Sequence, residues 1–426
     1  MSSTILVGAA EIDITPPYGA KMSGSLVPRP SAGAADPLFA RAIVLEQGDV
    51  RMAYVIFDLI GLVLPFGERL KAAASAATGI PADHIIWSCT HTHSGPYTIN
   101  YCPADTPDPV DYTWKEGLID QFAACVAEAD RRKAPMRVSR LRAYHLGLSH
   151  NRRLRYKDGR EINTWLLNQG EDLQCVGAAG PIDPEIGMLA FDDKAGRLQA
   201  VLFNFALHNN ARGDGKLSAE YTAVVAARLR EAFGPQVITL FMPGACGDLN
   251  NLVNYRQTGD SLADAMLPYL HERKPMADVT LGITSRRLTL PLRDPFLDQE
   301  ERLRKAQWWP DVEDFFRRSQ ADLQRENRTH LETLLHAWHI GEVAFATFPG
   351  EAFVELGLQL KRESPFPWTY PVELANDCVG YLITMQAWEA GGYEGLISTA
   401  APVAPEASGS IVTEDLAMLG ELWGDR

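Results

Sequence analysis

Residues 84–96, HIIWSCTHTHSGP, decide how the chain is expected to fold. The apolar run 84–89 is typical of a buried strand. A polar run, 90–96, follows at its carboxyl end and turns sharply at Ser-Gly-Pro. Because a strand and a helix precede it, the order is β–α–β, and ligands in such sheets usually bind at the carboxyl ends of strands. The sequence therefore places a candidate site directly after residue 89.

Strands and helices alternate along almost the whole chain. Apolar runs predict strands at 40–46, 52–57, 198–206, 236–242 and 343–348, and amphipathic runs predict helices at 66–78 and 219–233. This alternation indicates one mixed α/β catalytic domain, residues 1–426, with its active site at the strand ends.

Two segments depart from this alternation. The charged stretch 288–329, which contains Trp308 and Trp309, predicts a helical insertion, either a lid or a peripheral packing helix. Residues 400–410, AAPVAPEASGS, predict a loop that leads to a short terminal helix.

Two histidines lie in the polar run after the strand 84–89. His91 and His93 are two residues apart, so in an extended segment both side chains point to one side and can reach a single metal ion. The alternative is a pair of histidines that are hydrogen-bonded within a loop.

Other strand ends supply further polar groups. His208 follows the strand 198–206 and precedes two carboxamides, Asn209 and Asn210, and Glu351 follows the strand 343–348. Taken singly, His208 is equally compatible with a structural histidine, and Glu351 with an acid favoured by a helix dipole. The loop 244–251, GACGDLNN, allows close backbone approach, and its Asp and Asn side chains can orient a ligand or form an Asx-rich turn.

In their order along the chain, these fragments resemble the N-terminal catalytic domain of the neutral/alkaline, non-lysosomal ceramidases. The segments that carry the resemblance are 7–17 (VGAAEIDITPP), 36–42 (DPLFARA), 91–96 (HTHSGP), 204–208 (NFALH), 247–251 (GDLNN), 349–351 (PGE), 380–381 (GY) and 393–399 (YEGLIST). They extend from about residue 5 to residue 400, which is nearly the whole chain.

This resemblance implies a role for each matched residue. It makes His91, His208, Glu351 and Tyr393 the ligands of one Zn²⁺ per chain. It also places His93 beside the metal as a substrate or oxyanion contact and matches Arg152 to an arginine that lines the family's active site, where it is suited to holding the oxyanion. Our further candidates are Asp248 for the orientation of a ligand histidine, Tyr393 for a movement between metal and oxyanion, and Asn209, Asn250 and Tyr381 for substrate binding. Glu220 is an additional candidate for a general base.

Two departures from the family pattern shape the expected substrate. Asn250 stands where the family has a serine in this loop, so we exclude a covalent serine mechanism and expect water to be the nucleophile. The sequence also ends soon after residue 399, and we expect no C-terminal immunoglobulin-like domain. A small soluble substrate is therefore expected in place of membrane ceramide.

Composition and charge restrict the partners. The formal net charge of −14 is spread along the chain, which argues against a nucleic-acid partner. We find no secretory signal and no apolar stretch of about 18 residues, so we expect a soluble cytoplasmic protein without stable membrane insertion. The sequence leaves open whether the chain forms a homo-oligomer.

The expected activity is zinc-dependent hydrolysis of an amide C–N bond by metal-activated water. The sequence does not separate this activity from that of a zinc-dependent lactonase or esterase. A zinc-binding protein that has lost catalysis is a further alternative, although structural zinc sites are generally built from Cys and His alone. A phosphatase is disfavoured, because we find neither a glycine-rich phosphate loop nor a paired acidic motif.

Overall fold

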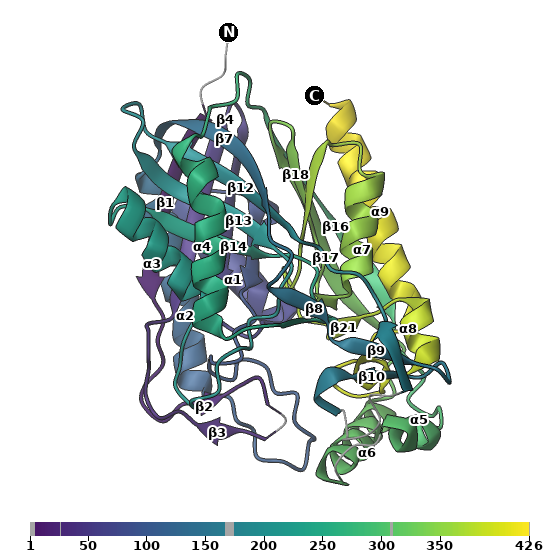
Figure 1. Cartoon of the computed structure of the whole chain (residues 1–426). Helices are drawn as coiled ribbons and strands as arrows, with labels where there is room; N and C mark the ends of the chain where they lie inside the picture. The colour runs from purple at the N-terminus through teal and green to yellow at the C-terminus, as the bar shows by residue number, and fades with distance from the viewer. Residues whose placement is uncertain (1–4, 26, 167–173, 307–309, 426) are drawn as a thin grey trace.

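Two β-sheets packed face to face organise the chain in the computed structural model (Figure 1). The structure describes residues 5–25, 27–166, 174–306 and 310–425. The larger sheet has eight strands, which in their order across the sheet are β14 (Ile238–Pro243), β13 (Leu198–Phe205), β12 (Glu185–Asp192), β7 (Ala134–Tyr144), β1 (Ile5–Asp13), β4 (Phe39–Gln47), β5 (Val50–Phe57) and β6 (Ile85–Cys89). The outermost pair at each edge is parallel, and the other neighbours are antiparallel.

The second sheet contains four strands, β16 (Leu281–Pro291), β17 (His330–Ile340), β18 (Val343–Thr347) and β20 (Trp368–Val372). The first three are antiparallel neighbours, whereas β18 and β20 run parallel. The parallel pair brings the carboxyl ends of β18 and β20 to the same edge of this sheet.

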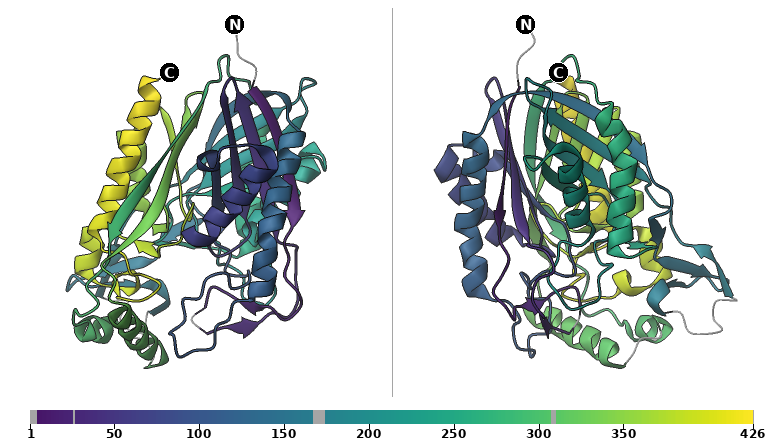
Figure 2. Two further views of the ribbon diagram at one scale, coloured as in Figure 1. Left: turned by 180° about the vertical axis from the view of Figure 1, so that it is seen from behind. Right: turned by 60° about the vertical axis from the view of Figure 1, so that its left-hand side comes forward.

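Most strands of the larger sheet are buried on both faces, and this explains why they are continuous apolar runs. The exception is β7, which contains three arginines and is only partly buried. On β4, Ile43 packs between the sheets with Trp338 and Phe345, whereas Ala42 and Val44 pack against helices. The helices on that outer face are α1 (Leu64–Thr78), α2 (Tyr112–Arg131), α3 (Tyr221–Phe233) and α4 (Tyr255–His271). Helices α7 (Val354–Glu363) and α9 (Glu406–Gly424) cover the second sheet, which gives four layers, α/β/β/α (Figure 2).

Short elements gather at the end of the sandwich that lies lowest in Figure 1. They are β2 (Lys21–Met22), β3 (Arg29–Pro30), β8 (Ser149–Asn151), β9 (Arg153–Tyr156), β10 (Glu161–Asn163), β11 (Cys175–Ala178), β15 (Leu249–Asn251), β19 (Glu351–Ala352), β21 (Tyr381–Leu382), α5 (Glu300–Ala306), α6 (Pro310–Glu326), α8 (Met385–Ala390), and the 3₁₀ turns η2 (Thr164–Leu166) and η4 (Tyr393–Gly395). A further 3₁₀ turn, η1 (Ala82–His84), leads into the opposite end of β6. The strand ends predicted to carry polar groups open towards this region.

The prediction of one mixed α/β domain is confirmed, and the predicted strands and helices begin and end close to the observed ones. Two local predictions differ from the structure. Residues 288–291 continue β16, so the helical part of the segment 288–329 is α5 and α6. Residues 406–410 belong to α9, because small residues such as Ala407 and Ser408 are buried where this helix packs on the second sheet. Trp308 and Trp309 lie outside the described residues.

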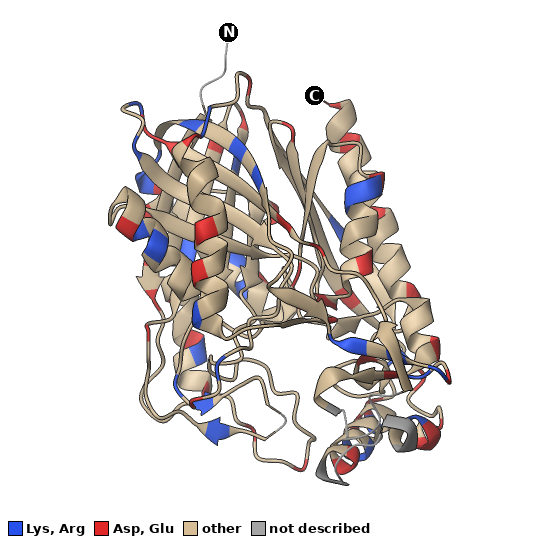
Figure 3. Cartoon of the chain, viewed as in Figure 1, with Lys and Arg blue, Asp and Glu red and all other residues tan. Residues whose placement is uncertain are grey.

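Charged residues of both signs are interspersed over the outer helices and loops, as the even spread of charge along the sequence indicates (Figure 3). Among the described residues, none of the helices combines the length and the apolar character that crossing a membrane requires.

Candidate metal centre

Three strand ends bring three histidines and one glutamate together. His91 and His93 follow β6, His208 follows β13, and Glu351 begins β19. The geometry after β6 differs from the extended segment that the sequence predicted. The strand ends at Cys89, and His91 adopts a left-handed φ of 57°. A tight turn therefore aims both histidines of this segment at the same point.

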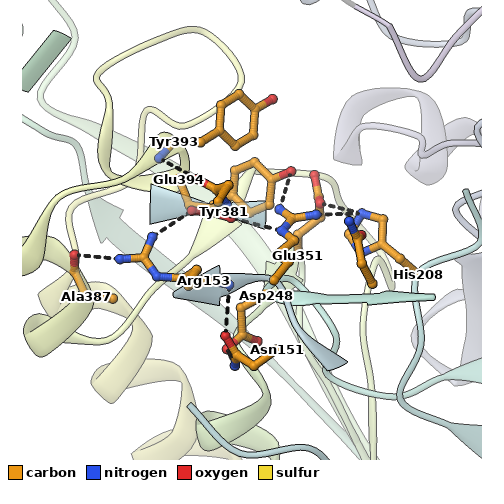
Figure 4. Close-up of polar contacts among 12 residues, drawn as sticks. Asn151, Arg153, His208, Asp248, Glu351, Tyr381, Ala387, Tyr393 and Glu394 are labelled. Atoms are coloured by element: carbon orange, nitrogen blue, oxygen red, sulfur yellow. Dashed lines mark hydrogen bonds and ion pairs between the residues drawn. The ribbon is translucent and has the colours of Figure 1, made fainter. Parts of the chain in front are cut away.

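The side-chain atoms of these four residues converge. The Nε2 atom of His91 lies 3.3 Å from Nε2 of His93 and 3.3 Å from Oε2 of Glu351. Oε2 of Glu351 is also 3.4 Å from Nε2 of His208, a contact visible in Figure 4. The candidate ligand atoms of the three histidines all lie within 4.8 Å of one another. These spacings suit a group that could hold a metal ion.

Backbone carbonyls fix the tautomer of each histidine. Nδ1 of His91 donates to the carbonyl of Ile60 at 2.8 Å, Nδ1 of His93 to Gly24 at 3.1 Å, and Nδ1 of His208 to Cys246 at 3.0 Å. Because a carbonyl oxygen can only accept, the proton of each neutral ring lies on Nδ1. All three Nε2 lone pairs therefore face the common centre, as is typical of metal-binding histidines.

Electrostatics at the centre also favour a cation. Burial lowers the pKa of His208 to about 4 and that of His93 well below its ordinary value, so both rings are neutral at pH 7. Burial alone would raise the pKa of Glu351, but the neighbouring histidines hold it well below its usual range. Oε2 of Glu351 is buried and has no hydrogen-bond donor among the described residues. Burial alone would lower the pKa of His91, but the neighbouring Glu351 carboxylate raises it above its ordinary value. Without a metal this pair shares a proton, and a metal that prefers nitrogen and oxygen ligands, such as Zn²⁺, would take the place of that proton.

Arg152 is a buried cation beside this group. Its Nε donates to Oε1 of Glu394 at 2.9 Å, and its Nη2 donates to the hydroxyl of Tyr381 at 3.1 Å. Its Nη1 lies 3.5 Å from Nε2 of His208. The backbone carbonyl of Asp248 accepts from the Arg152 amide at 2.8 Å. Arg152 is therefore held rigidly and reaches the cavity through Tyr381.

Two tyrosines lie beside the centre in different orientations. Tyr381 pairs with Glu351 across the parallel strands β21 and β19, so its ring lies directly next to the carboxylate. Tyr393 lines the same cavity, and its ring centroid is 5.6 Å from that of Tyr381. Figure 4 shows its hydroxyl turned away from the Glu351 carboxylate. Coordination by Tyr393 thus requires a rotation of its side chain, and its role as a ligand stays a prediction.

Asp248 differs from its expected role. Its Oδ1 accepts from the amide of Val354 at 2.8 Å, and its Oδ2 accepts from Asn151 at 2.6 Å. Among the described hydrogen bonds, Nδ1 of each histidine contacts a backbone carbonyl and not Asp248. The orientation of a ligand histidine by Asp248 stays a prediction that these contacts do not support. Asp248 instead connects the loop after β14 to α7 and β8.

The two carboxamides predicted to bind substrate are engaged elsewhere. Nδ2 of Asn209 donates to the carbonyl of Ala219 at 3.0 Å, and Oδ1 of Asn250 accepts from Asn210 at 3.1 Å. Neither Asn209 nor Asn250 is among the residues that line the cavity, whereas Tyr381 is. The structure thus brings one of the three predicted substrate contacts to the cavity.

Glu220, the additional general-base candidate, also serves the loops. It accepts from the Ser94 hydroxyl at 2.9 Å and from the amides of Ala211 and Arg212. Burial raises its pKa to about 8. Its hydrogen bonds tie the histidine turn to the loop after His208.

A cavity of about 150 Å³ opens beside the histidines. Its lining residues are Gly24, Ser25, Ile60, His91, His93, Ile99, Tyr101, Glu351, Cys378, Gly380, Tyr381, Tyr393, Thr399 and Ala400. The sequence did not indicate several of these, such as Ile60, Ile99 and Tyr101, because they are ordinary loop residues that only the tertiary fold brings to the site. Apart from Glu351 and the histidines, the lining side chains carry no formal charge at neutral pH.

No protein-family model matches the chain. In sequence it is similar to neutral ceramidase of Pseudomonas aeruginosa, with 25% identity over 198 residues, which make up 45% of this chain and only 28% of that protein. In structure it matches a crystal structure of neutral ceramidase from Pseudomonas aeruginosa with a TM-score of 0.77 and 17% identity, over 99% of this chain and 75% of that one. The chain has the neutral ceramidase fold.

A second solved structure agrees with this assignment. It is described as a ceramidase complexed with C2, and it matches with a TM-score of 0.74 and 16% identity over 99% of this chain and 76% of that one. The resemblance drawn from the sequence motifs is therefore confirmed at the level of the neutral ceramidase fold. At these identities the likeness establishes the fold, and the chemistry has to be argued from the site.

Proposed function

We propose that this protein is a zinc-dependent hydrolase that cleaves an amide C–N bond with water as the nucleophile. One observation carries the proposal: the Nε2 atoms of three buried histidines and Oε2 of Glu351 converge on one point. The amide as scissile bond is supported by the name of the sequence relative, a neutral ceramidase.

His91, His208 and Glu351 would hold the ion, and a bound Zn²⁺ supplies Lewis acidity and lowers the pKa of water towards about 7. In the reaction, water adds to the carbonyl carbon, the C–N bond breaks, and the amine nitrogen takes up a proton, which leaves a carboxylic acid and an amine. No side chain forms a covalent bond with the substrate, in agreement with Asn250 in the place of the family serine.

Tyr381 is suited to position the substrate carbonyl, because it lines the cavity and Arg152 donates to its hydroxyl at 3.1 Å and so orients it. His93 also lines the cavity, but its Nδ1 proton is engaged by the carbonyl of Gly24. Hydrogen-bond donors directed at the developing oxyanion typically contribute about 2.7–4 kcal/mol each to transition-state stabilisation. We assign this role to Tyr381, supported by Arg152.

The dimensions of the cavity favour a small substrate. The cavity volume of about 150 Å³ lies below the roughly 300–1,000 Å³ of pockets that enclose a drug-sized ligand. A two-chain lipid is larger than such a ligand and would not be enclosed. The uncharged walls favour a neutral acyl group, so we propose a short, uncharged amide as the substrate. As the location of the protein we propose the cytoplasm.

Metal analysis and a substrate panel test this proposal together. The protein is purified without chelators, analysed by elemental mass spectrometry, stripped, and reloaded with Zn²⁺. Each form is then assayed with short N-acyl amides, cyclic amides, lactones and detergent-solubilised ceramide. We expect one zinc per chain and turnover of short amides at least about tenfold faster than that of ceramide, a barrier difference of about 1.4 kcal/mol.

The other outcomes assign the alternatives. A preference for lactones would replace the amidase by a lactonase or esterase at the same centre. Stoichiometric zinc without turnover on any panel would indicate a binding protein that has lost catalysis. Equal or faster turnover of long-chain ceramide would refute the small substrate.

A further inference from the structure

Glu373 is a fully buried carboxyl group behind the metal centre. It follows β20 of the second sheet, and its side chain reaches the loop after β14 of the first sheet. Oε2 accepts from the amides of Cys246 and Ala352, each at 3.1 Å. Oε1 accepts from Sγ of Cys246 at 2.8 Å. Two oxygens thus satisfy three donors from two separate segments.

Both segments belong to the candidate metal centre. The carbonyl of Cys246 accepts from Nδ1 of His208 at 3.0 Å and so fixes the direction of that ring. Ala352 directly follows Glu351 in β19. A displacement of Cys246 would therefore turn His208, and a displacement of Ala352 would move the Glu351 carboxylate.

The backbones of these segments are in direct contact. The amide of Gly247 donates to the carbonyl of Ala352 at 2.8 Å. A Cβ atom on Gly247 would come within 2.5 Å of the Glu351 carbonyl oxygen, so only glycine allows this approach. Glu373 lies at this junction and hydrogen-bonds both sides of it.

A buried carboxyl group is an expensive means of joining two loops. Burial of an ionisable group without a charged partner opposes folding, and every described hydrogen bond that Glu373 accepts comes from a neutral donor. An apolar residue would fill the same space without that cost. What it could not do is hold Cys246 and Ala352 at a fixed separation.

We propose that Glu373 is a positioning residue that sets the distance between His208 and Glu351 through Cys246 and Ala352. This inference rests on the proposed metal centre. Glu373 acts first on metal affinity, and it affects turnover only through the bound metal. Residues that support metal ligands in this indirect way typically contribute about 10- to 100-fold to metal affinity.

The test compares two substitutions at this position. Glu373→Leu removes both acceptors. Glu373→Gln keeps one carbonyl oxygen for the two backbone amides and loses the acceptor for the Cys246 thiol. A third variant, Cys246→Ala, removes only the thiol contact. We expect zinc affinity, measured by competition with a chromogenic chelator, to fall by about 10- to 100-fold in Glu373→Leu and by less than about tenfold in the other two.

A matched control separates positioning from general stability. Leu229 is a residue of α3 that is buried in the core between this helix, α4 and the larger sheet, away from the centre. Leu229→Ala is chosen as a variant that lowers the unfolding temperature of the metal-free protein, and its zinc affinity should equal that of the wild type. The Co²⁺ absorption spectrum should change in Glu373→Leu and stay unchanged in Leu229→Ala, because only the former alters ligand geometry.

Each result bears on a distinct claim. Zinc affinity of Glu373→Leu within about threefold of the wild type, or a loss equal to that of Leu229→Ala, would overturn the positioning role. Should Glu373→Leu fail to fold, Glu373→Gln and Cys246→Ala decide, and unchanged affinity and spectra in both would count against it. A wild type that binds zinc but hydrolyses nothing refutes the proposed function alone, whereas a wild type that binds no zinc refutes both.

Discussion

Two buried polar clusters lie side by side in this molecule and differ in how their charges are balanced. In one, Arg152 and Arg153 share the carboxylate of Glu394 at 2.9 and 2.6 Å, Asn163 adds a third donor at 2.9 Å, and Arg153 also pairs with Glu161. In the other, the Nε2 atoms of the three histidines converge with Oε2 of Glu351, and among the described residues no side chain shared by the cluster balances them in the same way.

The comparison teaches how to distinguish a scaffold from a site. The arginine cluster satisfies its groups internally, so it needs no ligand and serves as a rigid support. The histidine cluster is less well balanced, because Nε2 of His91 and Nε2 of His93 face each other at 3.3 Å and Oε2 of Glu351 has no hydrogen-bond donor among the described residues. A cation supplies the missing partner. The predictions below test this difference.

The largest effect is expected from the loss of a metal ligand. His208→Ala should abolish stoichiometric zinc binding and turnover, because Nε2 of His208 lies 3.4 Å from Oε2 of Glu351 and both atoms are assigned as ligands of the same ion. Elemental analysis and panel kinetics measure both quantities. His336→Asn is the control, because His336 is also buried but lies outside the centre. Its Nε2 donates to the backbone carbonyl of Asp83, and its Nδ1 accepts from the side-chain amide of Asn376. Near-normal zinc content in His208→Ala would remove the ligand assignment.

A break in the arginine cluster should act on stability first. Glu394→Ala leaves two buried arginines without their shared partner, and such a loss typically costs about 3–5 kcal/mol of unfolding free energy. Denaturant titration with and without Zn²⁺ checks this. We expect the zinc affinity of the folded fraction to change little in comparison with His208→Ala. If Glu394→Ala lost zinc without losing unfolding free energy, Glu394 would belong to the metal centre, and the arginine cluster would not be a purely structural support.

Asp415 on α9 sharpens the comparison, because it is an unsatisfied buried group that has no convergent partners. Both of its carboxylate oxygens are buried and without a hydrogen-bond partner among the described residues. Burial raises its pKa well above the ordinary value of 3.8. The folded state therefore binds this proton more tightly than the unfolded state, and stability declines as the pH rises above about 3.8 towards the folded pKa.

Asp415→Asn should remove that decline. We expect this variant to lose less unfolding free energy between pH 4 and pH 7 than the wild type, because its amide does not ionise. Thermal unfolding across this range is the measurement, with Glu406→Gln, an exposed change on the same helix, as the control. An unchanged pH profile would show that Asp415 has a partner in solution. Zinc affinity should not respond.

The same contrast explains what the sequence could reveal. Strand periodicity and short motifs predicted the α/β class, the strand ends and the convergence of His91, His208 and Glu351, because these signals are local. The sequence did not reveal which backbone carbonyls orient the rings, because any residue supplies a carbonyl. Asp248 was chosen for that task on its side-chain chemistry, and the fold gives the task to Ile60, Gly24 and Cys246.

The left-handed backbone conformation of His91 could not be predicted from the sequence pattern. The sequence predicted an extended segment in which strand alternation places both histidines on one side, whereas in the structure a turn at His91 directs them to the same point. Glu373 shows the limit most clearly. It is 22 residues from Glu351 and 127 residues from Cys246 in the chain, and nothing in its neighbourhood marks it as part of the centre.

The smallest effect is expected at Asn250. Its side chain accepts one hydrogen bond from Asn210 at 3.1 Å and does not line the cavity, so Asn250→Ala removes a loop contact with a typical net value of about 0.5–1.5 kcal/mol. If all of that loss appeared in the transition state, kcat/KM would fall by about two- to tenfold. Asn210→Ala is the matched variant, because it breaks the same bond and also the one from Asn251 at 2.9 Å, and it should fall at least as far. Mass spectrometry of the protein during turnover completes the test. Since water is the nucleophile in the proposed reaction, no acyl group should remain on the loop 244–251. An acylated residue there would show that a side chain of this loop attacks the substrate and forms a covalent intermediate.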